Sequence, residues 1–399
     1  MFLEILIAII IGVNAGIITG LTPGIHVNLV SVILLSIAPL LPVNYSLSLV
    51  GFILALSVTH TFVDSIPSIF LGAPDSSMIM GVLPGHRFLL EGKGYSAVKL
   101  TVIGSFLSLV GSVMLMPLLV FIVPWLYEFI RPYVGYLILL MLGFMVLRDS
   151  KRMWGLFVIL VSGFFGYVVL HTPNVSDPLF PMLSGMYGVS TLLFSLKDNN
   201  SIPHQKVDQE LHVSKKDLGV AVSASTFAGF LTSMLPGMGG AQGAVIAMQL
   251  TRNLGTEGFM VLMGGINTVN FVLSTVTLFT LDKARNGAII AVKELLSEMT
   301  IWHLIAYGAI MLFVGSIAVV VTLYLASLFE KLIIKVNYGF LVKGIIFFIL
   351  VLVVLLCGWY GVLVMVVATA IGFIAPIVGC SRTHGMGCLL IPVAMYFLF

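Results

Sequence analysis

Charged residues are scarce in this chain of 399 residues: Asp, Glu, Lys and Arg together make up only 9%. Soluble domains contain about 25% charged residues, so a soluble fold is excluded for most of the chain. Hydrophobic residues make up 59%, and apolar runs of roughly 20 residues, long enough to cross a bilayer, occur at 101–123, 301–326 and 340–357. The composition therefore predicts an all-α integral membrane protein.

Signatures of soluble enzymes are also missing. The chain has no Walker A motif, so ATP is not expected to drive it. The three cysteines, Cys357, Cys380 and Cys388, lack paired spacing, which favours packing roles over disulfides or metal ligands. The basic residues fall in short loops and form no basic face, so nucleic acid is not an expected partner. We predict a non-enzyme that needs no cofactor beyond a coupling ion.

One short motif occurs twice. Residues 15–24 and 228–237 share the pattern A-G-x-x-T-small-x-x-P-G, at an offset of 213 (228 minus 15). We call this pattern the repeated motif. Its Pro-Gly pair breaks a helix, and broken membrane helices are tolerated only against protein or a wet cavity. Breaks at corresponding positions in two half-chains indicate the binding site of a transporter.

The two halves show the same order of segments. We expect a first membrane repeat at 1–196, a cytoplasmic linker at 197–217 and a second membrane repeat at 218–399. Each half has an early region with the Pro-Gly break, an apolar stretch, a polar segment and four spans. The apolar stretches are 47–72 and 258–281, and the polar segments are 84–99 and 282–299. The spans are expected at 100–123, 133–147, 154–171, 178–196, 301–326, 340–356, 359–378 and 386–399.

Basic residues predict the orientation. Fifteen of the 19 Lys and Arg residues lie at Arg252, at Arg382 or in the loops 84–99, 148–153, 197–217 and 327–343. Basic loops stay cytoplasmic, which places both termini outside. Each half then crosses an odd number of times, so the sequence predicts two inverted-topology repeats with broken or re-entrant helices at the Pro-Gly pairs. Which early stretches in 1–72 and 218–281 cross fully stays open.

Residues around the two breaks are the candidate substrate ligands. Thr22 precedes Pro23 as a helix N-cap would, and a helix beginning there would point free N–H groups into the break. Two such N-termini meeting at one axis favour a carboxylate or a phosphate. Alternatively, these residues only kink and pack helices. The candidates are Thr22, Pro23, Gly24, Asn28, Pro236, Gly237, Gly239, Gly240, Gln242, Asn267 and Asn270.

Two aspartates are candidates for ion coupling. Asp64 and Asp75 are the only carboxylates between Glu4 and Glu91, and both adjoin apolar sequence. With His60, Ser76 and Ser77 they form the candidate coupling set His60, Asp64, Asp75, Ser76 and Ser77, for Na⁺ or H⁺. Alternatively, His60 and Asp64 form a buried structural pair, because they share a helix face. Arg382, beside His384, is expected to anchor a helix end more than to bind an anion.

Several stretches resemble the large permease subunit of tripartite tricarboxylate transporters. Beside both copies of the repeated motif, these are Ser68–Asp75, Gly81–Gly85, Glu91–Gly94, Asp177–Phe180 and Ser184–Gly188. The resemblance implies a secondary transporter of organic anions in the cell membrane. It also implies a small membrane subunit and an extracytoplasmic binding protein as partners.

The sequence therefore predicts a permease for a small organic anion, a carboxylate above others, moved by symport with Na⁺ or H⁺. A polyprenyl-phosphate or related lipid-carrier translocase is the alternative. A membrane enzyme using His60 and Asp64 is a third hypothesis. The lipid bilayer is an expected partner, and a homo-oligomer is left open.

Overall fold

The computed structural model describes residues 2–22, 27–38, 42, 45–72, 78–172, 178–196, 213–235, 238–251, 254–284, 286–296, 298–333 and 338–399. Within these ranges the regular elements are all helical, with no strand. Seven helical stretches are long and apolar enough to cross a membrane. The expected all-α integral membrane protein is thus confirmed. The candidate residues that lie outside the described ranges are Pro23, Gly24, Asp75, Ser76, Ser77, Pro236 and Gly237.

The helices of the first half follow one another with short connections. They are α1 (Phe2–Leu21), α2 (Val27–Ile37), α3 (Ser46–Val63), η3 (Pro67–Leu71), α4 (Ile79–Leu90), α5 (Gly94–Ile130), η4 (Arg131–Tyr133), α6 (Val134–Arg148), α7 (Arg152–Leu170), α8 (Leu179–Leu183), η5 (Ser184–Val189) and α9 (Ser190–Leu196).

The second half contains fewer but longer helices. They are α10 (Lys215–Met234), α11 (Gly240–Leu250), α12 (Gly255–Leu281), α13 (Gly287–Leu295), α14 (Ile301–Ile333), α15 (Tyr338–Val378), η6 (Arg382–Met386) and α16 (Gly387–Leu398). The two spans expected at 340–356 and 359–378 are two helices within the stretch labelled α15, and they meet at Gly358, whose backbone is not helical (φ 64°, ψ −164°).

One expected segment is wrong. The loop expected at 84–99 is mostly helical, because its charges lie on a helix surface: Arg87 Nε and Glu91 Oε1 pair at 3.1 Å, one turn apart. The segment expected at 178–196 is one continuous helical stretch, in which the π-helical η5 lies between α8 and α9. Polarity alone therefore does not separate a loop from a short helix.

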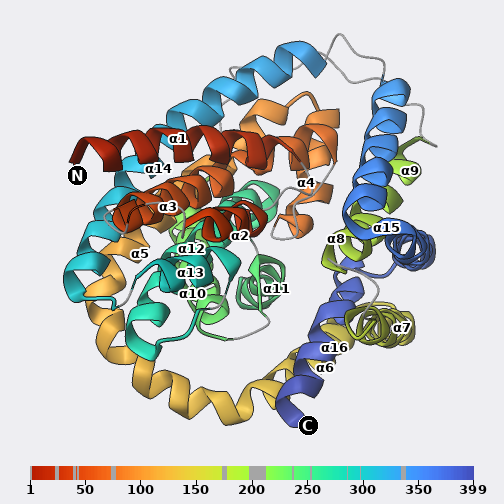
Figure 1. The fold of residues 1–399 in the computed structure, drawn as a ribbon. Coiled ribbons are helices and arrows are strands. Elements are labelled where there is room, and N and C mark those ends of the chain that lie inside the picture. Colours follow the sequence, from red (N-terminus) through yellow and green to blue (C-terminus); the bar gives the residue numbers. More distant parts are fainter. Residues whose placement is uncertain are drawn as a thin grey trace.

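The helices gather into two bundles (Figure 1). The core bundle consists of α1–α4 and α10–α13, with the long helices α5 and α14 packed against it. The side bundle consists of α6–α9, η5, α15, η6 and α16, and lies on the side away from the N-terminus in Figure 1. Each bundle therefore combines elements from both halves of the chain.

The repeated motif packs two helix pairs of the core bundle. Its first copy brings α1 against α3, and its second brings α10 against α12. A Cβ on Gly16 would lie 2.6 Å from the Leu56 carbonyl oxygen, and one on Gly229 would lie 2.5 Å from Val269 Cβ. Small residues allow membrane helices to approach this closely. The glycine of the motif is thus a packing residue in both copies.

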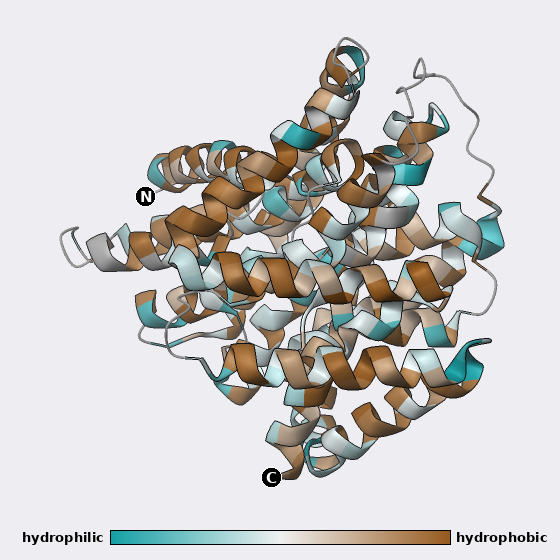
Figure 2. Ribbon diagram, turned by 90° about the vertical axis from the view of Figure 1, so that its right-hand side faces the viewer, coloured by the Kyte–Doolittle hydropathy of each residue, from teal (hydrophilic) through white to brown (hydrophobic). Residues whose placement is uncertain are grey.

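Large apolar side chains cover the outside of the molecule. Phe121, Phe164 and Trp359 are 80%, 73% and 77% exposed, and long stretches of many helices are coloured as hydrophobic in the ribbon of Figure 2. A soluble protein rarely exposes so much apolar surface. This surface is suited to contact with lipid chains, and the chain is a multi-pass membrane protein.

Candidate functional site

A cavity of about 520 Å³ lies between the core bundle and the side bundle. We call it the central cavity. Its core-bundle wall comes from α2, α3 and α10–α13, and from the residues just before α11 and α13. The polar residues of the lining all belong to this wall: Asn28, Ser57, His60, Thr61, Thr232, Gln242, Asn267, Asn270 and Asn286.

The opposite wall is apolar. The side bundle contributes Leu170, Leu179, Leu183, Leu389 and Val393, from α7, α8 and α16. A ligand in the central cavity would therefore make its directional contacts with the core bundle alone. The leucine-rich wall offers no fixed polar partner, so it can move past a bound polar ligand without breaking hydrogen bonds.

The N-terminus of α11 borders the central cavity. Gln242 Oε1 accepts a hydrogen bond from the Gly239 N–H at 2.9 Å, so the Gln242 side chain caps the first turn of the helix. Gly240 and Ala241 both line the cavity, and the first N–H groups of a helix have no intrahelical acceptor. These N–H groups and the positive end of the helix dipole favour an anion there.

A second helix N-terminus, that of α13, also borders the cavity. Asn286 Oδ1 accepts from the Ile289 N–H at 2.9 Å as the N-cap. Asn28 Oδ1 accepts from the Ala288 N–H at 3.2 Å, from the other half of the chain. Asn28 thus positions α13 as well as lining the cavity.

The threonines of the repeated motif make the same contacts in both copies. Thr19 donates to the Gly16 carbonyl at 3.2 Å, and its Oγ1 forms a second hydrogen bond with His60 Nδ1 at 3.0 Å. Thr232 donates to the Gly229 carbonyl at 3.0 Å and accepts from the Asn270 amide at 2.7 Å. Each motif threonine therefore fixes a polar residue that lines the central cavity.

Asp64 lies directly behind this wall. It is 1% exposed, and its Oδ2 accepts a hydrogen bond from Asn267 Nδ2 at 2.7 Å. The neighbouring contact is Thr268 Oγ1 to Thr61 Oγ1 at 3.1 Å. These bonds join α3 to α12, so the two halves of the chain meet at the wall of the cavity. The lining itself contains no Lys, Arg, Asp or Glu among the described residues.

Most of the predicted site residues that the structure describes come together here. Asn28, His60, Gly239, Gly240, Gln242, Asn267 and Asn270 line the central cavity. Thr22 does not line it: its hydroxyl donates to the Ile18 carbonyl at 2.7 Å and so satisfies the end of α1. Within the described ranges, no group of three His, Cys, Asp or Glu side chains is placed to hold a metal ion.

The sequence interpretation missed four polar residues of the lining, Ser57, Thr61, Thr232 and Asn286. Thr232 had a usable signal, because it is the threonine of the second motif copy. Asn286 lies in a polar segment between helices, where asparagine is common and gives no signal by itself.

Comparison with known proteins identifies the family of the chain. The family model for the tripartite tricarboxylate transporter TctA family matches residues 6–387. The chain belongs to the tripartite tricarboxylate transporter TctA family. Its members are permease subunits of transporters, so the chain is a transport protein and not an enzyme. An uncharacterized protein of Methanocaldococcus jannaschii is 31% identical over 408 residues, covering 98% of this chain and 99% of that protein. No solved structure matches the chain.

Proposed function

We propose that this TctA-family permease moves a small carboxylate through the central cavity together with a cation. The observation that supports this most strongly is the wall itself, where both halves of the chain contribute polar groups and α11 contributes free N–H groups. The substrate carboxylate would accept hydrogen bonds from these N–H groups and from the Gln242 and Asn267 amides. The polar contacts would come from the core bundle.

The charge of the wall bears on the substrate class. The described lining has no arginine or lysine. A helix N-terminus stabilises an anion by only about 0.3–2 kcal/mol, and a neutral amide adds one ordinary hydrogen bond. One or two carboxylate groups are therefore better matched to this cavity than three.

Asp64 supports coupling to a cation. Its carboxylate is buried one hydrogen bond behind Asn267, so an anion bound at Asn267 would face a negative charge through a single side chain. Like charges repel strongly at short range in a medium of low dielectric. A Na⁺ or a proton at Asp64 removes this repulsion, which links the binding of the anion to the binding of the cation.

Alternating access would follow if the two halves are inverted repeats, as the basic loops predict. The bundles would then move relative to each other, with the leucine-rich wall of the side bundle passing over the polar wall. A small membrane subunit and an extracytoplasmic binding protein, with which permeases of this family work, would deliver the substrate from outside.

A second candidate, a lipid-carrier translocase, is favoured by one observation. A largely apolar groove of about 950 Å³ runs along α6 against α10 and α11, and Met238 lines both this groove and the central cavity. An amphiphile would place a phosphate in the cavity and its chain in the groove.

The experiment is uptake of labelled succinate and citrate into proteoliposomes under an imposed Na⁺ or H⁺ gradient. Gln242→Ala and Asn267→Ala should each lower uptake at least about tenfold, since each removes a buried hydrogen-bond donor. Asp64→Asn should leave uptake insensitive to the cation gradient. Thr280→Val, at the far end of α12 and outside the lining, is the matched control. Unchanged uptake in both amide variants, or movement of a polyprenyl phosphate without any carboxylate, would refute the proposal.

A further inference from the structure

Two further cavities lie toward the C-terminal end of α11. Pockets of about 470 and 560 Å³ adjoin there and share the lining residues Pro84, Met248, Phe259, Ser381 and Thr383. We call the pair the vestibule. Helix α11 begins at the central cavity with Gly240 and reaches the vestibule with Met248, eight positions (248 minus 240) and about 12 Å further along its axis.

Packed segments separate the two spaces. Along the side bundle, Leu183 lines the central cavity and Tyr187 lines the vestibule. Between the bundles, η6 contacts α11 and η5 contacts α4. The vestibule is therefore a distinct compartment beyond this barrier. By the count of basic residues, its end of the molecule is predicted to be cytoplasmic.

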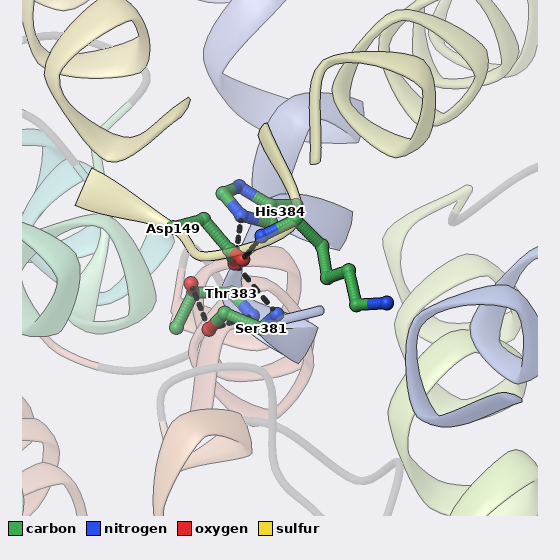
Figure 3. A network of polar contacts seen from close by, with 5 residues as sticks. Asp149, Ser381, Thr383 and His384 are labelled. Carbon is green, nitrogen blue, oxygen red and sulfur yellow. Dashed lines mark hydrogen bonds and ion pairs between the residues drawn. The ribbon is translucent and has the colours of Figure 1, made fainter. Parts of the chain in front are cut away.

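The segment before and within η6 is fixed by one carboxylate (Figure 3). Asp149 Oδ2, at the end of α6, accepts the Ser381 N–H at 2.9 Å and lies 2.8 Å from His384 Nε2. The Ser381 hydroxyl oxygen accepts the Thr383 N–H at 3.3 Å. With the residues on both sides held, the position of Arg382 is set by the fold and not left to a mobile loop.

Arg382 is the charged residue that lines the vestibule pocket of about 470 Å³. It is half-buried and donates from Nη1 to Thr191 Oγ1, and its guanidinium lies 6.0 Å from the centre of the Phe194 ring. Tyr187 holds the same segment by donating to the Arg382 carbonyl at 3.4 Å. Among the described residues, no carboxylate forms an ion pair with this guanidinium. Arginine has five N–H donors, so most of them remain for another acceptor.

We propose that the vestibule is a second anion site, in which the Arg382 guanidinium binds a carboxylate of the substrate and Thr383 adds a hydroxyl contact. A guanidinium binds a planar carboxylate through two parallel hydrogen bonds, and a partly desolvated cation gains most from such a partner. This proposal rests on the proposed function in one respect, the choice of a carboxylate as the ligand. The vestibule site would receive the carboxylate after the carboxylate has passed the barrier. Arg382 would then bind the substrate in addition to anchoring a helix end.

The test is the stoichiometry of ¹⁴C-succinate binding to the purified full chain in nanodiscs, measured by equilibrium dialysis at rising succinate concentration. The wild type should bind two succinates per chain. Arg382→Gln should bind one, with the second weakened at least about tenfold because a charge-assisted hydrogen bond is lost. Arg152→Gln, which removes an exposed charge at the same end and lines neither space, should still bind two.

A double variant separates the two proposals. Gln242→Ala with Asn267→Ala should abolish binding in the central cavity and leave the succinate at Arg382. If this double variant binds two succinates, the proposed function is wrong and the vestibule site stands. If Arg382→Gln binds two, the vestibule site is wrong and the central site stands.

Folding is controlled by size-exclusion elution of every variant. Should Arg382→Gln aggregate, Arg382→Lys replaces it, because lysine keeps the charge and loses the two parallel bonds. The vestibule site predicts weaker binding of one succinate in Arg382→Lys as well. Wild-type affinity for both succinates in that variant would overturn it.

Discussion

At Asp149 one carboxylate accepts three hydrogen bonds. The donors are the Lys151 N–H at 2.7 Å, the Ser381 N–H at 2.9 Å and His384 Nε2 at 2.8 Å. Burial alone would raise the pKa of Asp149, but these bonds outweigh it and lower the pKa below its ordinary value. Because the folded pKa is lowered, the stabilisation is complete above about pH 4 and is lost as the pH falls through the folded pKa.

Asp149→Asn should therefore lower the free energy of unfolding by about 1–3 kcal/mol at pH 7, since an amide has one acceptor oxygen for three donors. Thermal melting in detergent at pH 7 and at pH 3 measures this. The difference between variant and wild type should shrink at the lower pH. Glu128→Gln, which neutralises an exposed carboxylate on α5, is the control. Equal melting temperatures of Asp149→Asn and wild type at pH 7 would contradict the assignment.

Some residues of the cavity lining could be predicted from the sequence. Asn267, Asn270 and Gln242 could be found because uncharged polar residues stand out in apolar helices beside a repeated break. The His60–Thr19 and Asn270–Thr232 contacts could not, because the sequence does not give the crossing of α1 with α3 or of α10 with α12. Arg382 shows the same limit: only the fold places it against a pocket.

Helix pairing in the core bundle depends on the motif glycines. Gly16→Leu and Gly229→Leu should each destabilise the protein by about 1–3 kcal/mol or more, because the added side chain meets a neighbouring helix. The control is Gly111→Leu on α5, where a Cβ would have no neighbour within 4 Å. Melting temperatures in one detergent compare the three variants. Equal stability of Gly16→Leu and Gly111→Leu would show that the close approach of α1 and α3 is not required.

Long elements followed from the sequence better than short ones. The expected span at 301–326 lies within α14, and the stretch at 258–281 lies within α12. The polar segment 282–299 contains α13, whose N-cap Asn286 and partner Asn28 lie far apart in sequence. Short helices such as α13 are stabilised by tertiary contacts more than by composition, which is why apolar length did not reveal them.

At the scale of the whole molecule, the sequence predicted a membrane protein with one polar centre. The fold adds that the two walls of this centre come from different bundles. The core bundle supplies the polar wall of the central cavity, and the side bundle supplies the leucine-rich wall. This division depends on distant segments lining one cavity, as Asn28 and Leu389 do, and a single sequence does not reveal such an arrangement. The inverted orientation of the two halves and the cytoplasmic side remain predictions from the basic loops.

The central claim is that a carboxylate in the central cavity and a cation at Asp64, behind the cavity wall, bind together. Its most direct test is the affinity of the purified chain for succinate, measured by calorimetry across Na⁺ concentrations and across pH. We predict that Na⁺ or acid tightens succinate binding about 5- to 150-fold, as coupled sites typically do, and that Asp64→Asn removes this dependence. Succinate binding with the same affinity in wild type and Asp64→Asn, unaffected by either cation, would contradict the account.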